Sequence, residues 1–180
     1  MVIDGDEEFW IPYEISKIEF EVQWLIQRPL NRQLFNTEIN SIKSWIIGQT
    51  FSAEQIYTQA DFDEFARLSG DDNPIHVDPV FAARTGFGRT VAHGMLLYGT
   101  ICGLLSRHFP GTVQLEQNFI FPAPTYTDET MTVQAEITAV NLETGQIRLK
   151  TTMANPDGQL TCDGETVLEW KEGWDTDKRG

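Results

Sequence analysis

The sequence predicts an α+β fold in which a curled antiparallel β-sheet wraps around one apolar helix, and three observations lead to it. Four segments in the second half of the chain alternate apolar and polar residues, as strands with one buried face do. The first half carries mostly helical patterns. Between the halves, residues 94–109 are apolar on nearly every side, which in a soluble protein indicates a helix covered on most of its surface.

The alternating segments are residues 112–121, 130–140, 146–153 and 160–170, and they predict a four-strand meander. In the second of them, Val133, Ala135 and Ile137 share one face, and the intervening residues are polar. Turn residues fill 141–145 and 155–158, so the strands on either side of each link are expected to pair antiparallel. Residues 49–57 predict one more strand. An open edge of such a sheet favours pairing with a second copy of the chain, so we expect a homodimer or a higher homo-oligomer.

Two shorter helices are expected before the apolar one. Thr58 is a suitable N-cap for a helix that ends at Ser69 and Gly70. A second helix is predicted at residues 79–84, with Pro79 in its first turn, where a missing amide hydrogen costs least. The chain then divides into an N-terminal extension (1–44), a main domain (45–171) and a flexible tail (172–180). Within the extension, residues 18–24 alternate as a half-buried strand would.

Charge and cysteine content exclude several classes of function. The chain has 27 acidic and 13 basic residues, a formal net charge of −14, which repels nucleic acid and anionic membrane surfaces. The first nine residues are acidic where a signal peptide would be basic, and the longest apolar stretch is too short to span a bilayer. Cys102 and Cys162 form no C-x-x-C pair and fit core thiols. These features predict a cytoplasmic location.

Polar residues suited to proton transfer concentrate in residues 70–76. Asp71 and His76 lie five positions apart on a loop that Pro74 stiffens, and Pro74 also favours an extended conformation at Asn73. A carboxylate and an imidazole that face one cavity can together hold and deprotonate a water molecule. The amide of Asn73 could hold either partner in place. The alternative is that Gly-Asp-Asp-Asn-Pro is an ordinary surface turn.

Gly94 is the second candidate, because a glycine in the first turn of a helix can offer its backbone N–H to a negatively charged oxygen. Such a donor suits the enolate of a thioester. The alternative, which we prefer for Gly99 and Gly103, is that these glycines permit close packing of helix and sheet. His93 precedes the helix and is interpreted as a cap or a buried hydrogen-bonding residue.

Two other chemistries are not favoured. A metal site built on His76, Asp78 and His93 would lack an H-E-x-x-H pattern or a cysteine cluster, so no metal is predicted. Nucleophilic catalysis would need a G-x-S-x-G elbow or a reactive thiol. The chain has no such elbow, and Cys102 lies in the middle of an apolar helix.

The stretches 70–78, 81–87 and 91–96 closely resemble the MaoC-like (R)-specific enoyl-CoA hydratases and dehydratases, which have the hot-dog fold. The resemblance covers roughly residues 48–170. It implies that Asp71 and His76 activate water and that the Gly94 amide binds the thioester oxygen. It also implies reversible hydration of a 2-enoyl thioester of coenzyme A or acyl-carrier protein to the (R)-3-hydroxyacyl product, without a cofactor. Family members carry a serine where Cys102 stands, which weakens any polar support from that position.

Several further residues are candidates for substrate binding. Phe87, Leu97 and Tyr98 are possible walls of an acyl pocket along the apolar helix, although each also fits the core. Arg84 and Arg89 are candidates for the coenzyme A phosphates. Two alternative functions remain open at this point: a hot-dog thioesterase, and a non-catalytic module that binds acyl thioesters.

Overall fold

The computed structural model describes residues 45–170, so the predicted extension (1–44), its strand pattern and the tail from residue 171 lie outside the described residues. The elements are, in order, β1 (Thr50–Ile56), α3 (Gln59–Ser69), α4 (Pro74–Val77), α5 (Pro79–Ala82), α6 (Gly94–His108), β2 (Thr112–Ile120), β3 (Thr130–Asn141), β4 (Gln146–Ala154) and β5 (Leu160–Trp170). No helix within 45–170 is both long and apolar enough to cross a membrane.

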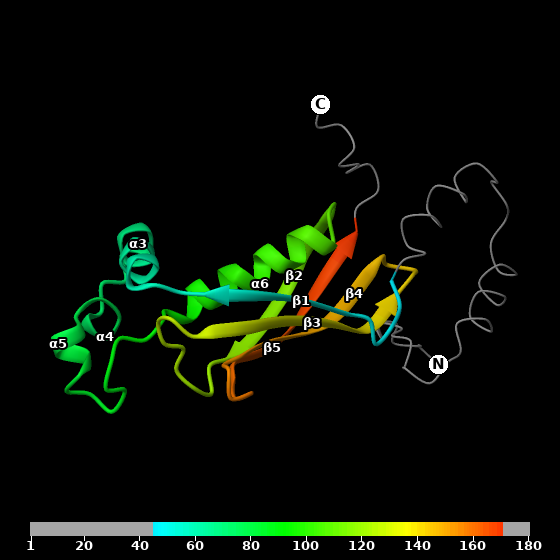
Figure 1. Ribbon diagram of the computed structural model, residues 1–180. Coiled ribbons are helices and arrows are strands. Elements are labelled where there is room, and N and C mark those ends of the chain that lie inside the picture. The colour runs from blue at the N-terminus through cyan, green and yellow to red at the C-terminus, as the bar shows by residue number, and fades with distance from the viewer. Residues whose placement is uncertain (1–44, 171–180) are drawn as a thin grey trace, which may run out of the picture.

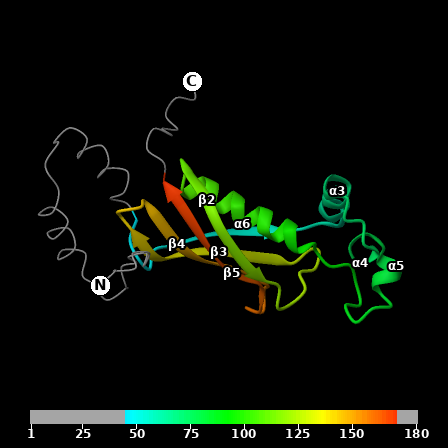
Figure 2. The ribbon, with the colours of Figure 1, turned by 180° about the vertical axis from the view of Figure 1, so that it is seen from behind.

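The five strands form one antiparallel sheet in the order β1-β3-β4-β5-β2, with α6 lying across one face (Figures 1 and 2). This arrangement confirms the predicted α+β hot-dog fold. The four-strand meander was wrong in one respect: only β3, β4 and β5 follow one another through tight turns. β2 pairs with β5 instead of β3. The proline-containing link 121–129 connects β2, at one edge of the sheet, to β3, which lies next to the opposite edge strand β1. The sheet edges are therefore β1 and β2.

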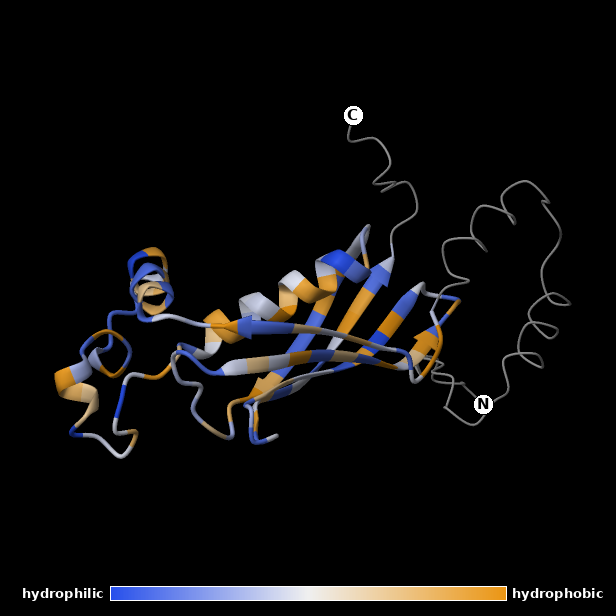
Figure 3. Cartoon of the chain, viewed as in Figure 1, coloured by the Kyte–Doolittle hydropathy of each residue, from blue (hydrophilic) through white to orange (hydrophobic). Residues whose placement is uncertain are grey.

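The core lies between α6 and the inner face of the sheet. Along β3 and β4 every second residue is buried, and Val133, Ile137, Ile147 and Leu149 have no exposed surface. Figure 3 shows the corresponding alternation of hydrophobic and hydrophilic residues along the strands. Register shifts in β2 and β3, at Leu115 and Thr138, bend the strands, as β-bulges do, and help the sheet curl around the helix.

Helix α6 buries one side and leaves another uncovered. Leu97, Ile101 and Leu104 are buried against the sheet, whereas Met95 is 51% exposed. The apolar sequence predicts a helix that is covered on most sides. Within residues 45–170, α6 is covered only in part. The basic residues of this helix, Arg107 and His108, fall in its last turn, where positive charge suits the helix dipole.

Helices α3, α4 and α5 gather at the end of the sheet where α6 begins (Figures 1 and 2). Helix α3 begins as predicted: the Thr58 side chain accepts from the Asp61 amide, and the Asp61 carboxylate accepts from the Thr58 amide, which forms a capping box. Helix α5 ends at Ala82, two residues earlier than predicted. The single-turn helix α4 was not predicted, and it changes how the loop presents His76.

Candidate active site

The loop between α3 and α4 is shaped by local hydrogen bonds. Gly70 ends α3 in the left-handed conformation, at φ 79°, with its amide donating to Ala66 O. Asn73 is extended, at φ −52° and ψ 125°, as expected for a residue before proline, and its side-chain oxygen accepts from the Ile75 amide. This cap begins α4, so His76 projects from a helical turn rather than from an open loop.

His76 is buried and held by the segment that precedes α6. Its side chain is 8% exposed, and Nδ1 lies 2.7 Å from the carbonyl oxygen of Val91. The Val91 amide in turn donates to Ile75 O. Because a carbonyl oxygen can only accept, Nδ1 must carry the hydrogen. The neutral ring therefore keeps Nε2 as a hydrogen-bond acceptor.

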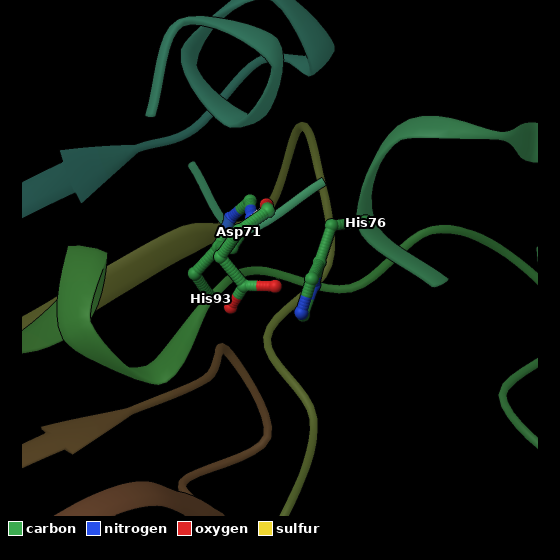
Figure 4. A group of neighbouring side chains, drawn as sticks. All are labelled: Asp71, His76 and His93. Carbon is green, nitrogen blue, oxygen red and sulfur yellow. The ribbon is translucent and has the colours of Figure 1, made fainter. Parts of the chain in front are cut away.

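The carboxylate of Asp71 lies beside the imidazole of His76. One carboxylate oxygen of Asp71 and one ring nitrogen each of His76 and His93 all lie within 4.8 Å of one another. Figure 4 shows the Asp71 carboxylate extending toward the His76 ring. Asp71 is exposed, whereas both histidines are buried. The pair therefore combines a solvent-accessible carboxylate with an imidazole whose orientation is fixed.

His93 is the buried hydrogen-bonding residue that the sequence suggested, but its side chain does not cap α6. Its Nε2 lies 2.9 Å from the backbone oxygen of Asp71, and its ring stacks on that of His76 with centroids 3.8 Å apart. Its Nδ1 is buried without a hydrogen-bond partner. Burial lowers the pKa of His93, although the hydrogen bond to the Asp71 backbone oxygen opposes this shift. Burial therefore favours the neutral form of His93.

Gly94 is the first residue of α6, so the turn before it supplies no acceptor for its amide. A Cβ at this position would lie 2.6 Å from Cζ of Phe121, so the exposed Phe121 ring would have to shift to admit a side chain. The packing role that we preferred for Gly99 and Gly103 is not supported by the structure. A Cβ at either position would have no atom of this chain within 4 Å, so neither glycine is required for packing within the described chain.

The other residues predicted from the sequence are placed as follows. The Asn73 side chain is used to cap α4, while its backbone amide lies 3.4 Å from the Asp71 carboxylate. Leu97 belongs to the core at 2% exposure, and Phe87 is 42% exposed. Tyr98 donates from its hydroxyl to Gln114 Oε1 at 2.5 Å. Burial raises the pKa of Tyr98 to about 12, which keeps this hydroxyl protonated.

The two arginines near the site have different surroundings. Arg89 forms an ion pair with Glu129 and lies over the Tyr126 ring, 4.0 Å from its centroid. Arg84 follows α5, is exposed and has no ion pair with another residue of the part that the structure describes. Arg84 therefore keeps its charge available for an anion, whereas the charge of Arg89 is largely compensated.

A cavity of about 340 Å³ lies at the far end of α6 from Gly94. It is lined by Cys102, Leu105, Ser106, Phe109, Pro110, Gly111, Thr112, Gln114 and Leu168. Cys102 is half-buried here and lies 3.9 Å from Gln114 Oε1, so its interpretation as a plain core thiol was wrong. Gln114 could not be identified from the sequence, because its contacts with Tyr98 and Thr166 join three separate elements.

The site could be considered for a metal ion, because Asp71, His76 and His93 bring three donor atoms close together. Asp78 is not part of this group, since its carboxylate accepts from the amides of Val80 and Phe81 and caps α5. The two imidazole planes are inclined by only 27°, and one nitrogen of each ring, His76 Nδ1 and His93 Nε2, already bonds to a backbone oxygen.

Comparison with known proteins agrees with the fold and the motif. Residues 44–156 match the model of the MaoC like domain. The (R)-specific enoyl-CoA hydratase of Aeromonas caviae is 35% identical over 131 residues, which is 72% of this chain and 98% of that protein. The 3-hydroxybutyryl-CoA dehydratase of Methylorubrum extorquens is 33% identical over 125 residues, 68% of this chain and 79% of that protein.

Solved structures give the same result. The structure of the (R)-hydratase from A. caviae superposes with a TM-score of 0.69 at 34% identity, covering 72% of this chain and 99% of that one. The R-hydratase PhaJ1 from Pseudomonas aeruginosa has a TM-score of 0.68 at 30% identity, covering 72% of this chain and 84% of that one. The motif, the hot-dog fold and these similarities lead to one conclusion: the chain belongs to the MaoC-like family.

Proposed function

We propose that this protein catalyses the reversible hydration of a trans-2-enoyl thioester to the (R)-3-hydroxyacyl thioester, with coenzyme A or acyl-carrier protein as the thiol. The observation that carries the proposal is the convergence of the Asp71 carboxylate and the His76 imidazole on His93, the residue directly before the first amide of α6. The names of the related hydratases and dehydratases support the same reaction class.

The two side chains divide the handling of one water molecule. The neutral imidazole of His76 presents Nε2 as an acceptor, because its hydrogen is on Nδ1 and is donated to Val91 O. Asp71 offers a carboxylate oxygen within reach of the same space. One group removes a proton from water as its oxygen bonds to C3, and a proton is delivered to C2. Water is thus added across the double bond, and the reverse sequence removes it.

The Gly94 amide stabilises the intermediate charge. Attack at C3 moves electrons toward the thioester carbonyl, whose oxygen becomes an enolate. In this proposal the first amide of α6, with the helix dipole behind it, donates to that oxygen. One such donor contributes on the order of 3 kcal/mol to transition-state stabilisation. The thioester is then bound with its C2–C3 bond directed toward Asp71 and His76.

No metal or redox cofactor is required by this mechanism, since both protons are handled by side chains. We expect hydration to continue at an unchanged rate after exhaustive treatment with a chelator such as EDTA. A loss of activity that added Zn²⁺ or Mg²⁺ restores would contradict this part of the proposal.

The decisive experiment is an assay of the full chain with crotonyl-CoA and longer 2-enoyl-CoA substrates. We expect the enoyl absorbance to decrease without release of free thiol, and the product to be the (R)-3-hydroxyacyl-CoA by chiral analysis. Release of thiol would instead identify a thioesterase. Stabilisation of the protein by enoyl-CoA in thermal melting, without turnover, would identify a binding module.

A further inference from the structure

Two histidines join the halves of the site by reciprocal hydrogen bonds. His76, from the segment after α3, donates from Nδ1 to the backbone oxygen of Val91 at 2.7 Å. His93, from the segment before α6, donates from Nε2 to the backbone oxygen of Asp71 at 2.9 Å. Each imidazole therefore holds the main chain of the segment that carries the other imidazole. We call this pair of bonds the histidine clasp.

The rings of the clasp also pack on each other. Their centroids are 3.8 Å apart. Phe65, on α3, packs against His93 with ring centroids 4.9 Å apart. His93 is only 2% exposed, so its side chain is surrounded by protein atoms. Because Asp71 O accepts from Nε2, neutral His93 has no hydrogen on Nδ1, and this atom is buried without a partner. Burial of His93 therefore carries the cost of one unsatisfied polar atom.

Asp71 depends on this clasp for its position. It lies in a short loop with no regular secondary structure, and among the described residues its backbone amide bonds only to Ser69 Oγ. Its carboxylate accepts a long bond from the Asn73 amide, at 3.4 Å. Within residues 45–170, the bond from His93 is the only hydrogen bond that connects Asp71 to a residue more than two positions away. His93 also immediately precedes Gly94, so it links the loop of Asp71 to the start of α6.

We propose that His93 is a positioning residue, whose Nε2–H holds the Asp71 backbone so that the carboxylate, the His76 imidazole and the Gly94 amide keep one productive geometry. This inference rests on the proposed function. Misplacement of a reacting group by about 1 Å can reduce a rate on the order of 100-fold. Loss of the His93 bond is therefore expected to act mainly on kcat, because substrate binding elsewhere is unchanged.

Two substitutions separate the hydrogen bond from the ring. His93→Gln places an amide N–H near the position of Nε2 and removes the aromatic ring, whereas His93→Phe keeps a ring and removes the donor. We expect kcat to fall on the order of 100-fold in His93→Phe, with KM changed by less than about twofold. His93→Gln should recover at least about tenfold of that loss. His108→Phe is the matched control, because His108 is exposed in the last turn of the same helix.

Hydrogen exchange of the free protein gives a readout that does not need turnover. Peptides covering residues 69–76 should exchange faster in His93→Phe than in the wild type, His93→Gln or His108→Phe. If the Phe variant does not fold, His93→Asn replaces it, because the shorter amide cannot reach Asp71 O. An inactive wild type would overturn the proposed function and leave this measurement valid. Wild-type kcat and exchange in His93→Phe, or no recovery in His93→Gln, would overturn the positioning role.

Discussion

The sheet with α6 and the segment 70–94 are held together by different forces. In the sheet, strand pairing and complete burial of residues such as Ile137 and Leu149 supply the stability. In the segment, polar side chains bond to the backbone at nearly every turn: Asn73 to Ile75, Asp78 to Val80, and His76 to Val91. Individual polar residues therefore position the site on a scaffold that does not depend on them.

This contrast predicts that substitutions separate into two classes. Changes in the sheet should alter the free energy of unfolding and leave the turnover of each folded molecule intact. Changes in the segment 70–94 should alter turnover more than stability. The predictions that follow test this division, beginning with the largest effect.

Asp71→Asn and His76→Asn are expected to lower kcat by about 10²- to 10⁴-fold, the range for loss of a general acid or base. At position 76, the asparagine amide can donate to Val91 O in place of Nδ1, so the link between the segments is kept and only Nε2 is removed. Steady-state hydration of an enoyl-CoA and thermal melting provide the measurement. Wild-type turnover in either variant would contradict the assignment, and so would a loss of turnover that merely follows unfolding.

Gly164→Ala should test the sheet. A Cβ at Gly164 would lie 2.9 Å from Cα of Phe119 and still closer to the backbone oxygen of Asn118, and neither backbone atom can move without disturbing β2. We expect a loss of about 1–3 kcal/mol in urea unfolding, with kcat unchanged for the folded fraction. A variant as stable as the wild type would mean that β2 and β5 are less rigidly paired than the structure indicates.

Gly99→Ala is the matched comparison within α6, because a Cβ there meets nothing within 4 Å in this chain. It should raise stability by about 0.5–1 kcal/mol, the usual gain from replacing glycine in a helix interior. A decrease would mean that atoms outside residues 45–170 cover this face of α6. The dependence of the same unfolding transition on protein concentration then tests whether they belong to a second copy of the chain.

The pH dependence of stability should reveal the buried His93. Its pKa in the folded protein is lowered from 6.5 by burial, so below about pH 6.5 the unfolded state binds more protons than the folded state. The contribution of His93 is thus complete above its unfolded pKa and is lost as the pH falls through the lower folded pKa. We expect His93→Gln to lose less stability than the wild type between about pH 7.5 and about pH 5. Equal losses in both proteins would contradict neutral burial of His93.

Much of the scaffold could be predicted from the sequence, because its signals are local. Alternation located β3, β4 and β5, and the Thr58 cap and Gly70 located the two ends of α3. The position of β2 beside β5 could not be predicted, since strands separated by some 40 residues pair through contacts that no short window contains. Likewise, α4 was missed because its single turn depends on the Asn73 cap.

The candidate site was predictable in part for the same reason. The proline-stiffened loop led to the expectation that Asp71 and His76 would face one space, and their donor atoms do lie close together, while their catalytic role stays a prediction. The histidine clasp could not be foreseen. It requires residues 71 and 93 to meet, and that meeting depends on how α3 and α6 are placed against the sheet.

The smallest effects are expected from the surface charges that border the segment. If Arg84 binds a coenzyme A phosphate, Arg84→Glu should raise KM by about two- to fivefold, the effect of one exposed charge pair. Arg89→Glu should have less effect on KM, because Arg89 already pairs with Glu129 and stacks on Tyr126. Both effects should shrink at high salt, which screens exposed charges. A larger change in KM at Arg89 would mean that substrate displaces Glu129, so that the ion pair is part of the binding site.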